Sequence, residues 1–245
     1  MKELERIKKK IAQLPAKKMS QKEQEFIGRY LGTNKKVLGV KIIDIVKIAK
    51  DIIKDNLDLN DLIKIIRSLV FSDTFEEHAI GAKIFSLLKP EIRAKISFLE
   101  LEDWLSKARG WVEIDTICQS TYTGEEVLVR LNDWEKTIKK FSKSDNISLR
   151  RASLVLQVKP VGKTNDLKLR QLAFETIEKL KQEKEILITK AVSWLLRALT
   201  VQNKEEVREY IIKNELSLPR IAYRETMKKI ETGKKNNNKA KTQKE

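Results

Sequence analysis

Apolar side chains recur every three or four positions along almost the whole of this 245-residue sequence, which is the spacing of helices with one buried face. In the segment VKIIDIVKIAKDII, for example, one stripe joins Ile42, Ile45, Val46, Ala49, Ile52 and Ile53. The chain has only 8 Gly and 4 Pro, which is low for a protein rich in strands or loops. We find no convincing strand, and the pattern therefore predicts an all-α protein.

The same periodicity divides the chain into helices of ten to seventeen residues joined by short loops. After the apolar segments between 40 and 90, we predict helices near 91–107, 111–120, 125–142, 147–158, 166–182, 185–201, 204–214 and 219–231. A break is expected in KPVGKTND, where Pro160 and Gly162 end one helix and Asn165 or Asp166 begins the next. Such a series predicts a HEAT-like α-solenoid of stacked antiparallel helix pairs, which curves and so presents a concave surface. A compact helical bundle is the alternative.

The chain is strongly basic, with a net charge of +16 and a pI near 9.7. Residues 233–245 (GKKNNNKAKTQKE) have five Lys and one Glu, so this segment contributes +4 and residues 1–232 keep +12. We predict that 1–232 form a single helical domain and that 233–245 form a disordered tail. Lysine and arginine favour a polyanionic partner. A solvated cationic surface without such a partner is the alternative.

Several classes of protein are excluded or disfavoured by composition. The single cysteine, Cys118, excludes an internal disulfide and a multi-cysteine zinc site, and the single histidine, His78, disfavours a multi-histidine metal centre or a Ser-His-Asp triad. We expect His78 to be a packing or capping residue, and we expect no metal or cofactor. No apolar run is long enough to cross a membrane, and the charged start MKELERIKKK does not suit a signal peptide. A cytoplasmic location is expected.

Two blocks place unusual side chains on one helix face. In GWVEIDTIC, Trp111 and Asp115 are four positions apart and share a face. In EKEILITKAVSWLLRAL, Lys190, Trp194 and Arg197 are spaced by four and three, so these three also lie together. The blocks thus offer a carboxylate, two indoles and fixed cations.

A third block, NISLRRASLVLQVK, contributes Arg150 and Arg151, which point in different directions on a helix. The apolar stripe there is formed by Leu149, Ala152 and Leu156. Arg151 is therefore expected to lie off the core, and we select it as the contact to a DNA phosphate.

This set of side chains suits the removal of a purine alkylated at N3 or N7. Such a base is already cationic, so it leaves without a general acid, and the chemistry needs only a carboxylate that stabilises the developing charge on the sugar. Asp115 fits that role, and the indole faces of Trp111 and Trp194 suit a cation or a positively charged sugar edge. A single tryptophan on a helix is more often part of the core, as we expect for Trp104 and Trp134.

The three blocks resemble the AlkD-like DNA alkylation repair family, the HEAT-like alkylpurine DNA glycosylases. WVEID is similar to the family's W-x-x-x-D, SLRRASLV to its arginine-containing helix, and EILITKAVSWLLRAL to its K-A-x-x-W-x-L-R helix. The resemblance extends to about residue 230 and implies a C-shaped stack of helix pairs with a basic concave face. It implies a metal-free and cofactor-free glycosylase acting on duplex DNA, nucleoid-associated when bound, with Asp115 as catalytic carboxylate, Trp111 and Trp194 lining the lesion and Arg151 on the backbone.

The resemblance is incomplete at three places. In one of them the helix that contains Trp194 continues LLRAL, where a glutamate often follows the arginine in the family. Ser193 replaces a glycine that is usual in the family, and an aromatic residue of an N-terminal DNA-facing helix has no clear counterpart, because Glu23 falls near that point, with Phe26 and Tyr30 close by.

We assign Arg150, Lys190 and Arg197, with Arg151, to DNA binding, and we expect a monomer. Two alternatives stay open. One is a non-catalytic relative that binds damaged or branched DNA, and the other is a HEAT-like scaffold for protein partners.

Overall fold

The computed structural model describes residues 2–14, 17, 19–55, 57–119 and 121–234. In these ranges the chain forms helices and loops, with no strand and one isolated bridge between Lys36 and Thr74. The first eight helices are α1 (Lys2–Ala12), α2 (Gln21–Leu31), α3 (Ile42–Lys54), α4 (Leu59–Val70), α5 (Phe75–Leu87), α6 (Pro90–Arg93), α7 (Phe98–Lys107) and α8 (Gly110–Cys118). The others are α9 (Gly124–Val129), α10 (Leu131–Ser142), α11 (Ile147–Lys163), α12 (Leu167–Leu180), α13 (Ile186–Leu199), α14 (Lys204–Lys213) and α15 (Arg220–Thr232). The all-α prediction is confirmed.

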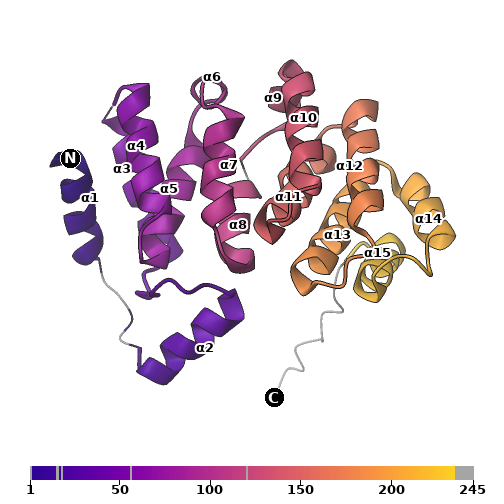
Figure 1. Ribbon diagram of the computed structural model, residues 1–245, viewed down its shortest axis with the longest axis horizontal. Coiled ribbons are helices and arrows are strands. Elements are labelled where there is room, and N and C mark those ends of the chain that lie inside the picture. Colours follow the sequence, from indigo (N-terminus) through magenta and orange to yellow (C-terminus); the bar gives the residue numbers. More distant parts are fainter. Residues whose placement is uncertain (1, 15–16, 18, 56, 120, 235–245) are drawn as a thin grey trace, which may run out of the picture.

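The helices stack side by side in two layers, as a solenoid does (Figure 1). In one layer α5, α8, α11, α13 and α15 contact one another in succession. The second layer covers it: α4 packs on α5, α7 and α10 on α11, α12 on α11 and α13, and α14 on α15. The buried apolar residues form one cluster that extends from Ile7 to Ile230. The structure therefore confirms the predicted solenoid rather than the alternative of a compact helical bundle.

Side-chain caps decide where several helices begin. Ser20 accepts a hydrogen bond from the backbone N–H of Glu23, whose side chain accepts one in return from the Ser20 N–H. A second such capping box, between Thr123 and Glu126, begins α9. Asp58 caps α4 in a similar way. Each cap binds backbone N–H groups of the first turn that would otherwise lack a partner.

Two helices that the sequence predicted as continuous are divided. The segment 91–107 forms α6 and α7, because Ser97 accepts a hydrogen bond from the Glu100 N–H and begins a new helix there. The segment 125–142 forms α9 and α10, because Arg130 between them has φ −120° and ψ 34°. The prediction of single helices over these ranges is wrong.

The predicted helix end at Pro160 is also wrong. Helix α11 continues through this residue to Lys163, and the N–H of Thr164 then donates to the Pro160 carbonyl. A proline inside a helix costs about 3 kcal/mol, because it removes a hydrogen bond and crowds the preceding turn. Helix α11 is packed against α8, α10, α12 and α13, and the burial of these contacts outweighs that cost.

The other core predictions agree with the structure. Trp104 and Trp134 are each 1% exposed, and His78 is fully buried. The Nδ1 of His78 lies 3.0 Å from the carbonyl oxygen of Val70, and its Nε2 lies 3.0 Å from that of Glu113. His78 therefore joins the end of α4 to α8 and serves packing, as predicted.

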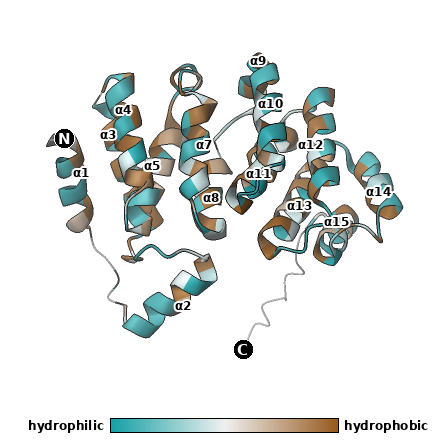
Figure 2. Cartoon of the chain, viewed as in Figure 1, coloured by the Kyte–Doolittle hydropathy of each residue, from teal (hydrophilic) through white to brown (hydrophobic). Residues whose placement is uncertain are grey.

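Helix α2 differs from the rest because none of its residues is buried. It lies apart from the two layers and is coloured mainly hydrophilic, whereas brown residues mark the packed sides of the other helices (Figures 1 and 2). Among the described residues no helix has the length and apolarity needed to span a bilayer. Of the predicted lysine-rich tail, residues 235–245 lie outside the described part of the chain.

Candidate functional site

A cavity of about 580 Å³ lies where α2, α8, α11, α13 and α15 meet. It is lined by Arg29, Tyr30, Gly32, Trp111, Arg151, Ile186, Leu187, Lys190, Trp194, Arg197, Ile221 and Glu225. Five of the residues selected from the sequence therefore line one cavity, although they come from three helices: Trp111, Arg151, Lys190, Trp194 and Arg197. Arg150 does not line it.

Asp115 lies behind this wall and is held by Arg151. The Nε of Arg151 donates to Oδ1 of Asp115 at 2.9 Å, and its Nη2 donates to Oδ2 at 2.7 Å. The third nitrogen, Nη1, donates to the carbonyl oxygen of Leu187, which ties the guanidinium to α13. Such a bidentate pair fixes the orientation of both groups.

The expectation that Arg151 lies off the core is wrong. Its side chain is 4% exposed and that of Asp115 is 7% exposed. Every residue from Arg151 to Gln157 is buried, because helices surround α11 on several sides. An apolar stripe therefore does not distinguish an inner from an outer face here. Burial raises the pKa of the Asp115 carboxyl, and the contact with Arg151 opposes that effect.

Trp111 is held by α2, which begins ninety residues earlier in the chain. Its indole Nε1 donates to the carbonyl oxygen of Tyr30 at 2.8 Å, and the two rings pack edge to face with centroids 5.9 Å apart. The turn that follows α2 touches the start of α8 closely: a Cβ on Gly110 would lie 2.2 Å from the carbonyl oxygen of Gly32. Gly110 also has φ +63°, so both its conformation and its surroundings require glycine.

The buried carboxylate of Glu113 completes this attachment. It accepts hydrogen bonds from the Thr33 hydroxyl and from the backbone N–H of Arg109, the latter at 3.0 Å. Glu113 therefore ties the loop after α2 to the first turn of α8. Its role is to hold Trp111 and α2 together rather than to reach the cavity.

Two other predicted arginines form contacts within the protein. Arg150 donates to the Glu183 carboxylate at 2.9 and 3.2 Å and to the carbonyl oxygens of Ser144 and Asp145. It links α11 to the turn after α12 and does not line the cavity, which disfavours the DNA contact predicted for it.

Arg197 lines the cavity and is also braced. Its Nε lies 3.3 Å from the Ser193 hydroxyl and 3.5 Å from Glu225, and Ser193 donates to Glu225 at 2.6 Å. The serine that replaces the family's usual glycine thus takes part in fixing Arg197 and Glu225. Within the described part of the chain, Lys190 forms no ion pair.

Sequence reasoning did not select Arg29 and Tyr30, which α2 contributes to the cavity. The signal was available, because Lys22, Phe26, Arg29 and Tyr30 are spaced by three and four and share a helix face. Phe26 is 66% exposed and Tyr30 is 68% exposed. An exposed aromatic and basic face of this kind is typical of nucleic-acid binding.

Two neighbouring depressions share lining residues with the cavity, and we call the three together the trough. The depression that shares Arg29 is lined by Gln24, Glu25, Gly28, Arg29, Thr33, Asn34, Lys35, Lys36 and Val37. The depression that shares Trp194 and Arg197 is lined by Val158, Lys159, Gly162, Lys163, Trp194, Arg197, Ala198, Val201 and Lys229. Together with the cavity, the trough is lined by nine lysines and arginines and by two glutamates, Glu25 and Glu225.

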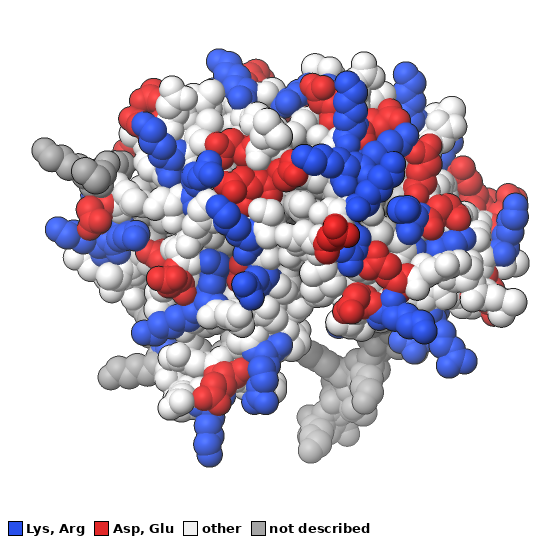
Figure 3. Space-filling model, in the orientation of Figure 1, with Lys and Arg blue, Asp and Glu red and all other residues white. Residues whose placement is uncertain are grey.

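The face formed by α4, α7, α10 and α12 has a different charge pattern. Basic and acidic side chains are interspersed over it (Figure 3). Many of them form ion pairs, such as Lys64 with Asp61 and Lys140 with Glu102. The lining of the trough, with nine basic and two acidic residues, favours a polyanionic ligand there.

Among the described residues, no group of three or more His, Cys, Asp or Glu side chains is placed to hold a metal ion. The sole cysteine, Cys118, is buried, and burial raises the pKa of its thiol. The chemistry that the site offers is thus that of a carboxylate, indole rings and fixed cations.

These features define a class: a helical solenoid with a cationic and aromatic trough beside a buried carboxylate–guanidinium pair. The chain belongs to the DNA alkylation repair enzyme family, whose model matches residues 11–230. The fold is similar to the structure of a predicted DNA alkylation repair enzyme from Enterococcus faecalis, with a TM-score of 0.69 and 20% sequence identity. That match covers 88% of this chain and 97% of the other. No curated protein matches the sequence.

Proposed function

We propose that this protein is a DNA glycosylase that hydrolyses the N-glycosidic bond of cationic N3- and N7-alkylpurines in duplex DNA. Membership of the family indicates DNA alkylation repair and DNA as the partner. The observation that carries the finer proposal is the buried Asp115 carboxylate, held by Arg151 at the wall of a cavity whose sides include Trp111 and Trp194.

The substrate explains why one carboxylate suffices. An alkylated purine carries its own positive charge and leaves without being protonated, whereas most glycosidic bonds need a second group as general acid. As the bond to the base lengthens, positive charge develops on the deoxyribose. A carboxylate fixed beforehand in a site of low polarity stabilises that charge more than it would in water.

Asp115 keeps the capacity to act while it is paired. Each of its oxygens accepts one hydrogen bond from Arg151, which leaves further acceptor positions for an attacking water. Arg151 opposes the effect of burial on the pKa of the carboxylate and fixes its direction. We therefore assign Arg151 to positioning Asp115, with any phosphate contact as a second role.

The indole rings and the cations hold the DNA. Trp111 and Trp194 lie on the cavity wall and present π faces or edges to a cationic base or sugar. Tyr30 of α2 extends this aromatic surface. We propose that Tyr30 serves as the N-terminal DNA-facing aromatic residue for which the sequence offers no clear counterpart. Lys190 and Arg197 provide positive charge for the phosphates on either side. The trough supports the predicted basic concave face, and we propose that a monomer binds the duplex there, in the cytoplasm at the nucleoid.

The experiment compares base release from duplex DNA containing 7-methylguanine and 3-methyladenine by the parent protein and by Asp115→Asn. The asparagine keeps the shape and can still accept from Arg151, but it has no charge. We expect the variant to lose most base release, roughly 100-fold or more by analogy with the loss of one electrostatic stabiliser, while it still binds duplex DNA.

Fold and binding are controlled by thermal unfolding and by duplex titration of both proteins. Equal release by parent and variant would remove Asp115 from catalysis. Salt-sensitive duplex binding without release by either protein would favour the non-catalytic DNA-binding alternative, and the absence of duplex binding would favour the scaffold.

A further inference from the structure

The depression beyond Trp194, which we call the distal groove, is not needed for the chemistry. It is lined by Val158, Lys159, Gly162 and Lys163 of α11, by Trp194, Arg197 and Ala198 of α13 with Val201 just after it, and by Lys229 of α15. We propose that the distal groove binds the phosphate backbone of the strand next to the lesion, with Lys163 and Lys229 as phosphate contacts. The inference rests on the proposed function, because it uses the same DNA.

The direction of the groove follows from which residues each part contains. Along α13 and the turn after it, the cavity is lined by Lys190, Trp194 and Arg197, and the distal groove is lined by Trp194, Arg197, Ala198 and Val201. On α11 the sequence runs from Arg151 in the cavity to Lys163 in the groove, and on α15 from Glu225 to Lys229. The three helices thus run in the same direction along the trough, with Trp194 shared by both parts.

The length of this path fits several nucleotides. Lys190 and Val201 are eleven positions apart, which is about 16 Å at 1.5 Å per residue. Phosphates on one strand of B-DNA follow one another at about 3.4 Å along the axis. The path therefore passes about five phosphates, more than the single lesion nucleotide requires.

The charge of the distal groove suits a backbone rather than an apolar ligand. Its lining contains four basic residues and no acidic residue. Arg197 is braced by Glu225 and thus shares its charge, whereas Lys163 and Lys229 form no ion pair with another described residue. Lys163 is exposed and Lys229 is half-buried, so both side chains can reach an anion in the groove.

The lining of the groove includes two small residues, Gly162 and Ala198, and packing does not require glycine at position 162. A Cβ on Gly162 would lie 3.8 Å from the Cβ of Ala198, an ordinary contact, and Gly162 does not have a positive φ. A larger residue would fit and would also favour the helix, since glycine is a poor helix former. The absence of a side chain at Gly162 instead keeps the groove open there, which allows a backbone to approach α11 and α13 closely.

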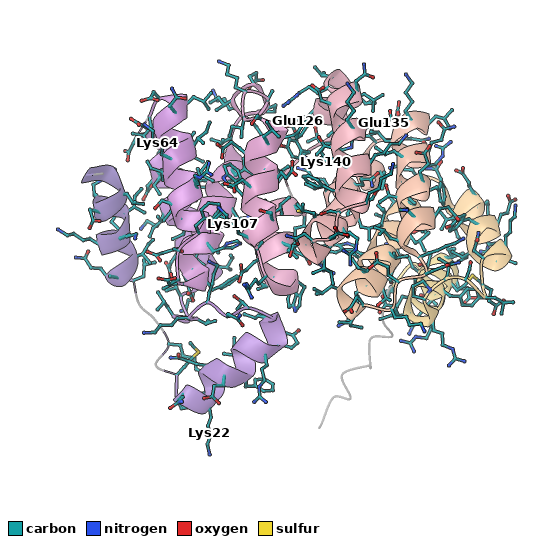
Figure 4. All side chains as sticks on the ribbon, viewed as in Figure 1. Lys22, Lys64, Lys107, Glu126, Glu135 and Lys140 are labelled. Carbon is teal, nitrogen blue, oxygen red and sulfur yellow. The ribbon has the colours of Figure 1, made fainter. Side chains whose placement is uncertain are left out.

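The test is the salt dependence of binding to a duplex that carries a 7-methylguanine lesion. The test protein is Lys163→Ala/Lys229→Ala, and the matched control is Lys64→Ala/Lys140→Ala, which removes the same charge from α4 and α10 on the opposite layer (Figure 4). Each phosphate contact contributes about 0.9 to the slope of log K against log [salt], so the test variant should lose about 1.8. At 0.1 M salt it should then bind on the order of 60-fold more weakly than the parent. The control should keep the parent slope.

A second measurement locates the strand. Methylphosphonates, which are neutral, replace single phosphates at one to five nucleotides on each side of the lesion in each strand. Binding by the parent should weaken at a run of phosphates on one side of the lesion, and the Lys163→Ala/Lys229→Ala variant should be insensitive to replacements within that run. Replacement of the phosphates held by Lys190 and Arg197 should weaken both proteins alike.

The outcomes separate this inference from the proposed function. Equal slopes for the test variant, the control and the parent would overturn the distal groove while base release that depends on Asp115 still stood. Methylphosphonate effects that persist unchanged in the test variant would also overturn it. If the parent itself binds no duplex, both proposals fail together.

Discussion

Removal of Arg151 should destabilise the protein chiefly through the charge that it leaves behind. In Arg151→Met the methionine fills much of the same space, but Asp115 stays buried without its partner. Removing one member of a buried ion pair costs about 3–5 kcal/mol, several times the value of an exposed pair. For a chain of this length 1 kcal/mol shifts the unfolding midpoint by about 2–4 °C, so we expect a decrease of about 6–20 °C near pH 8.

The effect should depend on pH in a defined direction. Without Arg151 only burial acts on the Asp115 carboxyl, and burial raises its pKa in the folded protein above the value of about 3.9 in the unfolded chain. The folded variant then binds the proton more tightly than the unfolded chain does. The destabilisation is therefore fully present above the folded pKa, and it shrinks as the pH falls through that value.

The assay is thermal unfolding of the parent, of Arg151→Met and of Asp115→Asn/Arg151→Met, each between pH 8 and pH 5. The double variant removes the stranded charge and should recover part of the lost stability. A single variant within about 0.5 kcal/mol of the parent at pH 8 would refute the reasoning, because that is the range of surface substitutions. A loss that stays constant over this pH range would show that lost packing, not charge, is responsible.

Two further predictions concern the cavity. Gly110→Ala should displace α2 from α8, because the added Cβ would overlap the Gly32 carbonyl oxygen and the residue has φ +63°. We expect a loss of about 1–3 kcal/mol in stability and faster proteolysis around α2. A variant with parental protease resistance would contradict this attachment. As the pH is lowered, base release should begin to decline above pH 3.8, the ordinary pKa of the carboxyl, because burial raises the pKa of Asp115 and only its ionised form acts. Single-turnover rates over the acid range measure this decline. A rate that stays constant down to pH 4 would argue against the assignment.

The sequence predicted the architecture well because the three- and four-residue spacing reports directly on which helix faces are buried. It failed at features that spacing does not report. Nothing in the apolar pattern distinguishes a continuous 91–107 helix from two helices separated by the Ser97 cap, and a proline such as Pro160 ends a helix only when tertiary contacts do not compensate.

The sequence predicted which residues lie near the site better than it predicted how they are arranged. Trp111 and Trp194 were identified from spacing and resemblance, and they do line one cavity. The burial of Arg151 could not be inferred, because α11 is buried nearly all round and its polar residues are not confined to one face. The approach of Tyr30 to Trp111 depends on a long-range contact that a single sequence does not report.

The attachment of α2 also bears on the order in which the chain can acquire its structure during synthesis. The acceptor for the Trp111 indole is Tyr30, 81 positions earlier, and the hydroxyl that binds Glu113 is that of Thr33, 80 positions earlier. At ribosomal rates of about 5–20 residues per second, α2 therefore waits roughly 4–16 s for its docking surface to emerge. Because α2 buries no residue of its own, it can wait in water without exposing core surface to aggregation. The wall of the cavity that includes Tyr30 and Trp111 is thus completed only when the middle of the protein has left the ribosome.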